Sequence, residues 1–245
     1  MKILIKTTSI LFLWTVTAFI AQAQQKINEG SITYNYVYVP DTSSAGSDLT
    51  KMPTTYKILF KNNLIKSEMG SELEAMLPGI NATTITDATT GNQLILLDVQ
   101  GGKFAIKIKA ETLADNPLTM LGSLIFGLKD VKASGVKKNS KGHELEKYTS
   151  PATENKLNEI WIAQDIKLPF TNFGKLVAGP ANALFEKAEL KGPVLEFKGW
   201  VMLQGMSFTA DIKAENIGTL SMDIPADYIE YTLEELMDMM GKSKQ

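Results

Sequence analysis

The side chains best suited to chemistry in this sequence are aromatic, and they alternate in the manner of a β-strand. Tyr34, Tyr36 and Tyr38 are spaced two residues apart, so on a strand all three project from one face. A row of aromatic side chains of this kind serves either as part of the core of a sheet or as the lining of an apolar pocket. In a pocket, the tyrosine hydroxyls would give a ligand hydrogen-bond partners. The residues that we expect to line this pocket are Tyr34, Tyr36, Tyr38, Phe60, Phe104, Leu121, Leu124, Ile125, Trp161 and Trp200.

Side chains for catalysis are scarce by comparison. His143 is the one histidine, and as a general base it would need an orienting acid and a nucleophile. Ser140 and Glu144 are the only candidates nearby in the sequence, and there is no Gly-x-Ser-x-Gly motif. A hydrolase that uses carboxylates would need two acids converging in a cleft, and the sequence shows no such pair. We therefore expect His143 to lie at the surface or at a strand edge, and the chain not to be an enzyme.

The composition excludes most metal and cofactor sites. The chain has no Cys and no Arg, which rules out thiol catalysis, disulfides, zinc–thiolate and iron–sulfur sites, and bidentate arginine clamps. Glu234 and Asp238 lie four residues apart on a predicted helix, and we interpret them as part of its polar, solvent-exposed face. Met237 and Met240 have helical spacing and indicate core packing rather than a copper site. We expect no metal and no cofactor, and a formal net charge of -2 argues against nucleic acid as a partner.

Hydrophobic alternation with a period of two dominates the rest of the chain. Its clearest segments lie at 32–38, 56–60, 103–109, 160–162, 195–203 and 208–214. Turn signals fall between such segments at 90–92, at 139–142 and at Gln204-Gly205, a candidate two-residue hairpin. The pattern predicts about ten strands with short connections in one curved antiparallel sheet.

Three segments carry helical spacing instead. One runs from 118 to 128 after an Asn-Pro helix start, a second from 172 to 190, and a third from 232 to 240. In the third, Thr232 and Glu235 have the spacing of a capping box. The predicted fold class is therefore mainly β with helices (α+β), in which one curved antiparallel sheet is covered by short helices.

The first residues have the pattern of a cleaved secretory signal. Lys2 and Lys6 precede an apolar run at 9–20, and Ala21-Gln22-Ala23 is a small-x-small cleavage site. The apolar run is shorter than the ~20 residues that span a bilayer. We expect cleavage of residues 1–23, a single domain over 24–245, and release into a periplasm or the exterior, so that the mature chain is not an integral membrane protein.

The order of the strand segments resembles a known group of secreted proteins. The segments that carry the resemblance are Glu29–Tyr34, Tyr56–Asn63, Ile65–Glu68, Thr84–Asp87, Leu94–Asp98, Gly142–Tyr148 and Glu159–Asp165. They resemble the secreted domains of unknown function grouped as family 4412, which look similar in turn to the periplasmic lipoprotein carriers LolA and LolB. The resemblance implies an incomplete barrel whose helices close a hydrophobic concavity for acyl chains. Leu145 stands where that family often carries Cys, and the chain lacks the Arg that controls opening in the carriers.

Two functions from different classes follow from these patterns. The first is a secreted or periplasmic, non-enzymatic binding protein with an apolar pocket for a lipid-like or other hydrophobic ligand, with Leu121, Leu124 and Ile125 on a movable lid. The second is a structural or interaction module of the envelope with a filled core and no small-molecule ligand. The two differ in whether the interior between sheet and helices is hollow or filled. The sequence leaves the identity of a protein partner and the oligomeric state open.

Overall fold

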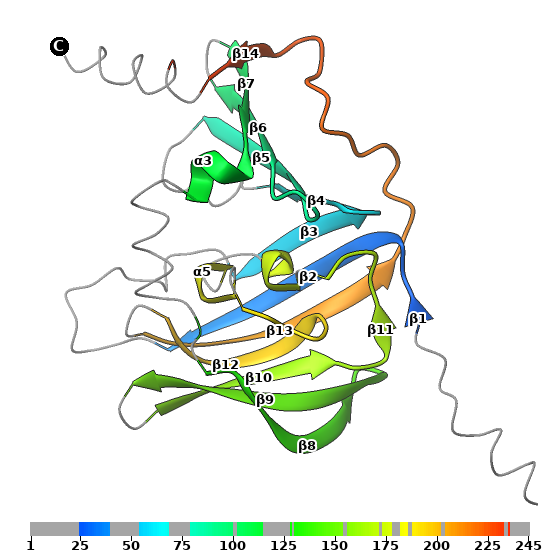
Figure 1. Ribbon diagram of the computed structural model, residues 1–245, viewed down its shortest axis with the longest axis vertical. Coiled ribbons are helices and arrows are strands. Elements are labelled where there is room, and N and C mark those ends of the chain that lie inside the picture. Colours follow the sequence, from blue (N-terminus) through cyan, green and yellow to red (C-terminus); the bar gives the residue numbers. More distant parts are fainter. Residues whose placement is uncertain are drawn as a thin grey trace, which may run out of the picture.

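The structure of this chain, a computed structural model, consists almost entirely of β-strands (Figure 1). It describes residues 25–39, 54–68, 79–99, 102–114, 128, 130–153, 156–171, 173–177, 182–185, 188–201, 204–232 and 235. The predicted signal sequence lies outside the described residues, as does the helix predicted at 118–128 except for its last residue. Most of the helix predicted at 232–240 lies outside them as well.

Twelve of the strands form one large sheet that does not close. In chain order they are β2 (Glu29–Val39), β3 (Thr55–Lys61), β4 (Leu64–Glu68), β5 (Ile80–Asp87), β6 (Gln93–Val99), β7 (Gly102–Ile108), β8 (Lys132–Ser140), β9 (His143–Thr153), β10 (Lys156–Ala163), β12 (Val194–Val201), β13 (Gln204–Ala214) and β14 (Ile229–Tyr231). Their spatial order is β14-β7-β6-β5-β4-β3-β2-β13-β12-β10-β9-β8, so β14 and β8 are its two ends. The prediction of one large, incomplete sheet is confirmed.

The sheet is mixed rather than purely antiparallel. Its neighbouring strands are antiparallel except for β14, which pairs with β7 in parallel. Two further strands, β1 (Gln25–Lys26) and β11 (Ile166–Lys167), form a separate parallel pair. Figure 1 shows the strong twist of the large sheet: β5, β6 and β7 run steeply at one end, β2 and β13 cross obliquely in the middle, and β8 and β9 curve at the other end.

The turn predicted at 139–142 is a tight hairpin between β8 and β9. Lys141 and Gly142 both have positive φ angles, 51° and 84°, which is the geometry of a type I′ turn. Ser140 pairs with His143 across it. Lysine tolerates this conformation less well than glycine, so the closure of the hairpin depends mainly on Gly142.

The hairpin predicted at Gln204-Gly205 is wrong by two residues. Both residues belong to β13, and Gln204 pairs with Val201 of β12. The connection between the two strands therefore precedes Gln204, and Gly205 lies inside the ladder. A Cβ atom on Gly205 would lie 3.1 Å from the Cβ of Val39 on β2. Glycine at a strand position often marks such a close approach, and here it imitates a turn signal.

In the described part of the chain, short helices do not cover the sheet, contrary to expectation. Among the described residues the helical segments are α3 (Ala110–Ala114), the 3-10 helix η2 (Phe173–Leu176) and α5 (Asn182–Phe185). The helix predicted over 172–190 is therefore broken into two single turns. These turns fold back on one another, since a Cβ atom on Gly174 would lie only 1.9 Å from the carbonyl oxygen of Phe185. Apolar spacing suited to a long helix is used here in a compact irregular segment.

The capping box predicted at the C-terminal helix is confirmed. The backbone N–H of Thr232 donates to Glu235 Oε2 at 2.8 Å, and the N–H of Glu235 donates to Thr232 Oγ1 at 3.2 Å. This reciprocal pair satisfies two donors at a helix start. Leu233, Leu236 and the methionines that follow lie outside the described residues.

Register assigns every side chain to one of two faces. Directly paired residues of neighbouring strands project from the same face, and the pairs that connect one face across the sheet are Tyr148–Ile160, Ile160–Phe197, Phe197–Phe208, Phe208–Tyr36, Ile32–Ile58, Ile58–Ser67, Ser67–Thr84, Thr84–Ile95 and Ile95–Ile106. We call this the tyrosine face, because it carries Tyr34, Tyr36 and Tyr38. The other is the tryptophan face, because it carries Trp161 and Trp200.

Each face has its own hydrophobic cluster. The larger lies mainly on the tyrosine face and joins β2, β3, β10, β12 and β13 to η2 and α5. The smaller lies on the tryptophan face of β5–β7, where Ile85, Leu94, Leu96 and Ala105 are buried. Side chains of the segment 215–228 cover this smaller cluster, and Figure 1 shows that segment running from the end of β13 to β14. The segment 215–228 therefore shields the tryptophan face of β5–β7 from solvent.

Candidate functional site

An aromatic cluster occupies the centre of the tyrosine face. Phe208 of β13 contacts the rings of Tyr34 and Tyr36, each with a centroid separation of 5.2 Å. It also stacks on Phe197 of β12 at 5.5 Å, and Phe185 of α5 approaches both phenylalanines at 5.4 and 6.3 Å. The side chains of these aromatic residues therefore pack over β2, β12 and β13. Our predicted lining did not include these three phenylalanines, although the alternation of β12 and β13 indicated one apolar face.

Four of the predicted lining residues meet in this cluster. Tyr34 and Phe60 are fully buried, Tyr36 is buried, and Tyr38 is half-buried and packs against the cluster. Tyr38 stacks on Tyr36 at a centroid separation of 5.9 Å. Phe60 meets Phe170, which precedes η2, in an edge-on contact at 6.0 Å. The segment that includes η2 and α5 therefore reaches β3 as well as β12 and β13.

Phe104 lies on the same face but in a different neighbourhood. It is half-buried on β7, and its ring contacts Tyr231 of β14 at 5.6 Å. Next to it on this face Ile106 is only 2% exposed, and Ile95 and Leu97 of β6 are half-buried. This part of the tyrosine face is apolar like the centre. Ile106 belongs to neither hydrophobic cluster of the described residues.

The hydroxyl group of Tyr34 is buried without a hydrogen-bond partner in the described part of the chain. Tyr34 is 0% exposed, and burial raises the pKa of its hydroxyl far above the ordinary value. The group is therefore a neutral donor at every physiological pH. Strand side chains stand roughly perpendicular to the sheet, so this hydroxyl points away from the backbone of β2 into the apolar interior.

The two predicted tryptophans lie on the opposite face from the tyrosines. Trp161 pairs with Glu196 and Lys147, and Trp200 pairs with Gly205, all on the tryptophan face. Lysines cover both rings: Lys138 Nζ lies 4.0 Å from the centroid of Trp161, and Lys156 Nζ lies 3.2 Å from that of Trp200. Neither tryptophan ring therefore shares a pocket with Tyr34, Tyr36 and Tyr38, although Trp161 packs against the larger hydrophobic cluster.

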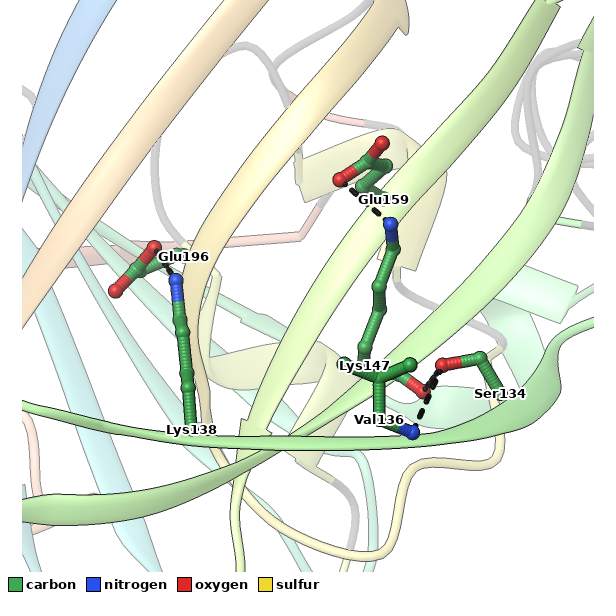
Figure 2. Close-up of polar contacts among 6 residues, drawn as sticks. All are labelled: Ser134, Val136, Lys138, Lys147, Glu159 and Glu196. Carbon is green, nitrogen blue, oxygen red and sulfur yellow. Dashed lines mark hydrogen bonds and ion pairs between the residues drawn. The ribbon is translucent and has the colours of Figure 1, made fainter.

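Two ion pairs lie on the tryptophan face of β8–β12, and their lysines approach the ring of Trp161; Figure 2 shows both pairs. Lys138 Nζ lies 2.6 Å from Glu196 Oε2, and Lys147 Nζ lies 3.0 Å from Glu159 Oε2. The edge strand β8 is held to β9 by Ser134, whose hydroxyl donates to the carbonyl oxygen of Lys147 at 2.9 Å and accepts from the N–H of Val136 at 3.3 Å. The pairing of β8 with β9 is irregular between Ala133 and Lys137, and an irregularity of this kind at a sheet edge discourages further strand pairing.

Glu196 is the most strongly held carboxylate of this group. Its half-buried position tends to raise its pKa, but hydrogen bonds from Lys138 and from the hydroxyl of Ser140, the latter at 2.7 Å, outweigh burial and lower the pKa below its ordinary value. A lowered pKa in the folded state means that the ionised carboxylate stabilises the fold at neutral pH. That contribution is lost as the pH falls through the folded-state pKa.

We therefore expect Glu196→Gln to destabilise the protein more at pH 7 than at pH 3. The physical reason is that a larger fraction of wild-type Glu196 is protonated at the lower pH, so the difference between the two proteins shrinks there. Urea unfolding of both proteins at the two pH values measures the difference in the free energy of unfolding. Lys138→Gln should show the same trend, and an equal loss at both pH values would contradict this role of Glu196.

His143 has an acidic partner that lies far from it in the sequence. Its Nδ1 is 3.2 Å from Asp165 Oδ2, and both side chains are largely buried. Ser140, the nucleophile candidate, pairs with His143 across the hairpin but donates its hydroxyl to Glu196. The His143–Asp165 pair therefore joins β9 to the segment between β10 and β11. No local sequence signal points to Asp165, because the two residues meet through the register of β9 and β10.

The remaining predicted site residues are Leu121, Leu124 and Ile125, which lie outside the described residues. Within the described ranges, His, Asp and Glu side chains do not gather in groups of three that could hold a metal ion. Over the same ranges, no helix is both long and apolar enough to cross a membrane.

Comparison with protein-family models finds no match, and comparison with curated proteins finds none either. Among solved structures, the chain is similar to PNGF-II in two crystal forms, with 11% and 12% identity and TM-scores of 0.43 and 0.45. Those alignments cover 88% of this chain but 33% and 34% of PNGF-II, so the chain spans about a third of its length.

Two further similar structures are smaller proteins of mycobacteria. They are the lipoprotein LppX of Mycobacterium tuberculosis and LprF of Mycobacterium bovis, each with 10% identity and a TM-score of 0.31. The alignments cover 76% and 77% of this chain, and 85% and 89% of those proteins. TM-scores this low carry no argument about the fold of this chain, which is described from its own strands and their register.

Proposed function

We propose that this chain is an exported, non-enzymatic binding protein that holds a lipid-like ligand against the tyrosine face of an incomplete barrel of the LolA type. The observation that carries the proposal is the apolar part of this face on β6 and β7, in a sheet that does not close. Ile95, Leu97, Phe104 and Ile106 lie there, separated from the aromatic centre by Ser67 of β4 and Thr84 of β5. Among the described residues, ring contacts from the segment containing η2 and α5 reach β3, β12 and β13 and not β6 or β7. Export follows from the predicted signal sequence at 1–23.

The hydrocarbon of the ligand would contact the part of the face formed by β5–β7. Ile95 and Leu97 are half-buried there, beside the buried Ile106 and Ile108. Side chains of this kind are typical of the lining of sites for apolar ligands, which suits a ligand that is recognised mainly by burial.

The length of the ligand follows from the energy of burial. Each buried methylene contributes about 0.8 kcal/mol, while association costs roughly 4–15 kcal/mol. A fully buried chain of about sixteen carbons gains about 13 kcal/mol, which exceeds most of that range of costs, whereas a chain of about six gains about 5 kcal/mol, which reaches only its lower end. We expect affinity to rise steeply with acyl chain length.

One observation favours the alternative function of an interaction module with a filled core. The rings of Phe185, Phe197 and Phe208 contact one another at the centre of the face, where they leave little room for a guest. If the same held over β5–β7, the chain would act through its exposed residues alone. Exposed apolar residues such as Val37 and Leu157, 63% and 60% exposed, would then belong to a partner surface.

Lipid analysis of the purified chain separates the two functions. The chain is purified without denaturant or detergent, and its organic extract and native mass are measured by mass spectrometry. The binding function predicts a bound lipid of defined stoichiometry, and saturable binding of the neutral fluorescent probe N-phenylnaphthylamine after delipidation. Absence of both would leave the interaction module as the better account.

A pair of matched variants locates the binding. Ile95→Lys places a charge on the tyrosine face of β6, and we expect it to weaken probe binding at least about tenfold, since a charge in an apolar site is strongly disfavoured. Val37→Lys places the same charge at an exposed position on the tryptophan face of β2 and should leave binding unchanged. Urea unfolding of both variants shows that each remains folded.

A further inference from the structure

The buried hydroxyl of Tyr34 needs an explanation, because buried polar groups in native proteins are almost always hydrogen-bonded. Tyr34 lies on β2 in the middle of the large sheet and is 0% exposed. Its hydroxyl oxygen has no hydrogen-bond partner among the described residues. Phenylalanine at this position would fill nearly the same volume without that penalty. A tyrosine here therefore indicates a partner that is not part of the described chain.

Tyr34 is enclosed by its neighbours in the sheet, so a guest molecule reaches its hydroxyl only when the side chains around it move. Its paired residue on β13 is Ala210, which is small, and its paired residue on β3 is Tyr56. The edge of its ring meets Phe208 at 5.2 Å, which fixes the ring in the aromatic cluster. The hydroxyl consequently lies in the interior over β2.

The surroundings of Tyr34 also define the charge of that guest. Among the described residues the buried polar side chains are Ser31, Ser150 and Asn158, none of which is ionised. The lysines form ion pairs whose partners are at least partly exposed, such as Lys138 with Glu196 and Lys147 with Glu159. An ionised headgroup beside Tyr34 would therefore be buried without a counter-charge, which is strongly unfavourable.

We propose, building on the function above, that the Tyr34 hydroxyl donates a hydrogen bond to a neutral polar atom of the ligand, such as an ester, ketone or alcohol oxygen. The site therefore selects neutral lipids over ionised fatty acids. The hydrogen bond adds selectivity, and the apolar strands supply most of the affinity. Burial keeps the Tyr34 hydroxyl protonated, as a donor requires.

The test compares two probes that differ only in the headgroup. Delipidated full-length chain is titrated with cis-parinaric acid and with its methyl ester, whose fluorescence reports binding. At pH 8 we expect the ester to bind at least tenfold more tightly than the ionised acid. As the pH falls toward 5 and the acid becomes neutral, its affinity should rise, while that of the ester stays constant. Equal or tighter binding of the ionised acid at pH 8 would overturn the proposal.

Tyr34→Phe tests the hydroxyl itself. This variant should bind the ester three- to tenfold more weakly, which is the range of one hydrogen bond, and should bind the pure hydrocarbon probe diphenylhexatriene as wild type does. Tyr148→Phe is the matched control, because the Tyr148 hydroxyl already donates to Glu146 at 3.2 Å; it should bind both probes normally.

The outcomes separate the two proposals. Unchanged ester affinity in Tyr34→Phe would mean that the hydroxyl meets only an internal water or a group of the chain, and would overturn this inference while the binding function stands. Failure of wild type to bind the ester, the acid and diphenylhexatriene alike would overturn the binding function, and this inference with it.

Discussion

Phe208→Ala should lower the free energy of unfolding by about 4 kcal/mol, one of the two largest losses that we expect from a single substitution. Phe208 is 2% exposed and lies on β13 at the centre of the large sheet. Its ring meets those of Tyr34, Tyr36, Phe185 and Phe197. Removal of the ring takes apolar area from the core and also leaves a cavity that rigid neighbours cannot fill, and both effects destabilise the fold.

Urea unfolding monitored by circular dichroism measures this loss. Phe104→Ala is the control, because Phe104 is half-buried and the ring that it contacts is Tyr231; it should lose no more than about half as much. The cavity should also admit a small apolar molecule such as benzene, which would partly restore stability to Phe208→Ala. A loss below about 2 kcal/mol would mean that the cluster is loosely packed, contrary to the ring contacts.

Gly174→Ala should destabilise the protein by about 3 kcal/mol, although it adds a single methyl group. The new Cβ atom would lie 1.9 Å from the carbonyl oxygen of Phe185, so η2 and α5 could not keep their present distance. The obstacle is backbone, which cannot rotate away as a side chain does. Phe185 would be displaced from Phe197 and Phe208, and the segment over the tyrosine face would loosen.

The comparison for this variant is Gly205→Ala. Its nearest contact would be the Cβ atom of Val39 at 3.1 Å, which a shift of a few tenths of an ångström relieves, so the expected loss is under about 1 kcal/mol. Hydrogen exchange should show faster exchange at 173–177 and 182–185 in Gly174→Ala but not in Gly205→Ala. Equal stability of the two variants would contradict the close approach of η2 and α5.

Local alternation in the sequence was enough to predict the strands and the inward side of several of them. In β2, Ile32, Tyr34 and Tyr36 are buried while Asn35 and Val37 are exposed, as a period of two requires. The same rule separates Trp161 from its buried neighbours Ile160 and Ile162 on β10. What the sequence could not show was the register between strands, and the prediction therefore grouped Trp161 with the tyrosines.

Features that depend on distant parts of the chain were missed. Asp165 joins His143 only because β9 and β10 pair in a particular register. The parallel addition of β14 to β7 depends on the segment 215–228, whose burial against the tryptophan face has no periodic signature. The prediction of one helix over 172–190 was wrong because the apolar residues there belong to two separate turns that fold against each other. Helical spacing of apolar residues does not distinguish one long helix from two such turns.

The position of a bound ligand tests the central claim most directly. A long-chain methyl ester brominated in its hydrocarbon tail is added to the delipidated chain, the complex is crystallised, and the bromine is located by anomalous scattering. The proposed function predicts a bromine peak against the tyrosine face of β4–β7, with the ester oxygen near the Tyr34 hydroxyl. A structure in which side chains of the protein fill that whole face, with the bromine absent or on the tryptophan face, would contradict it.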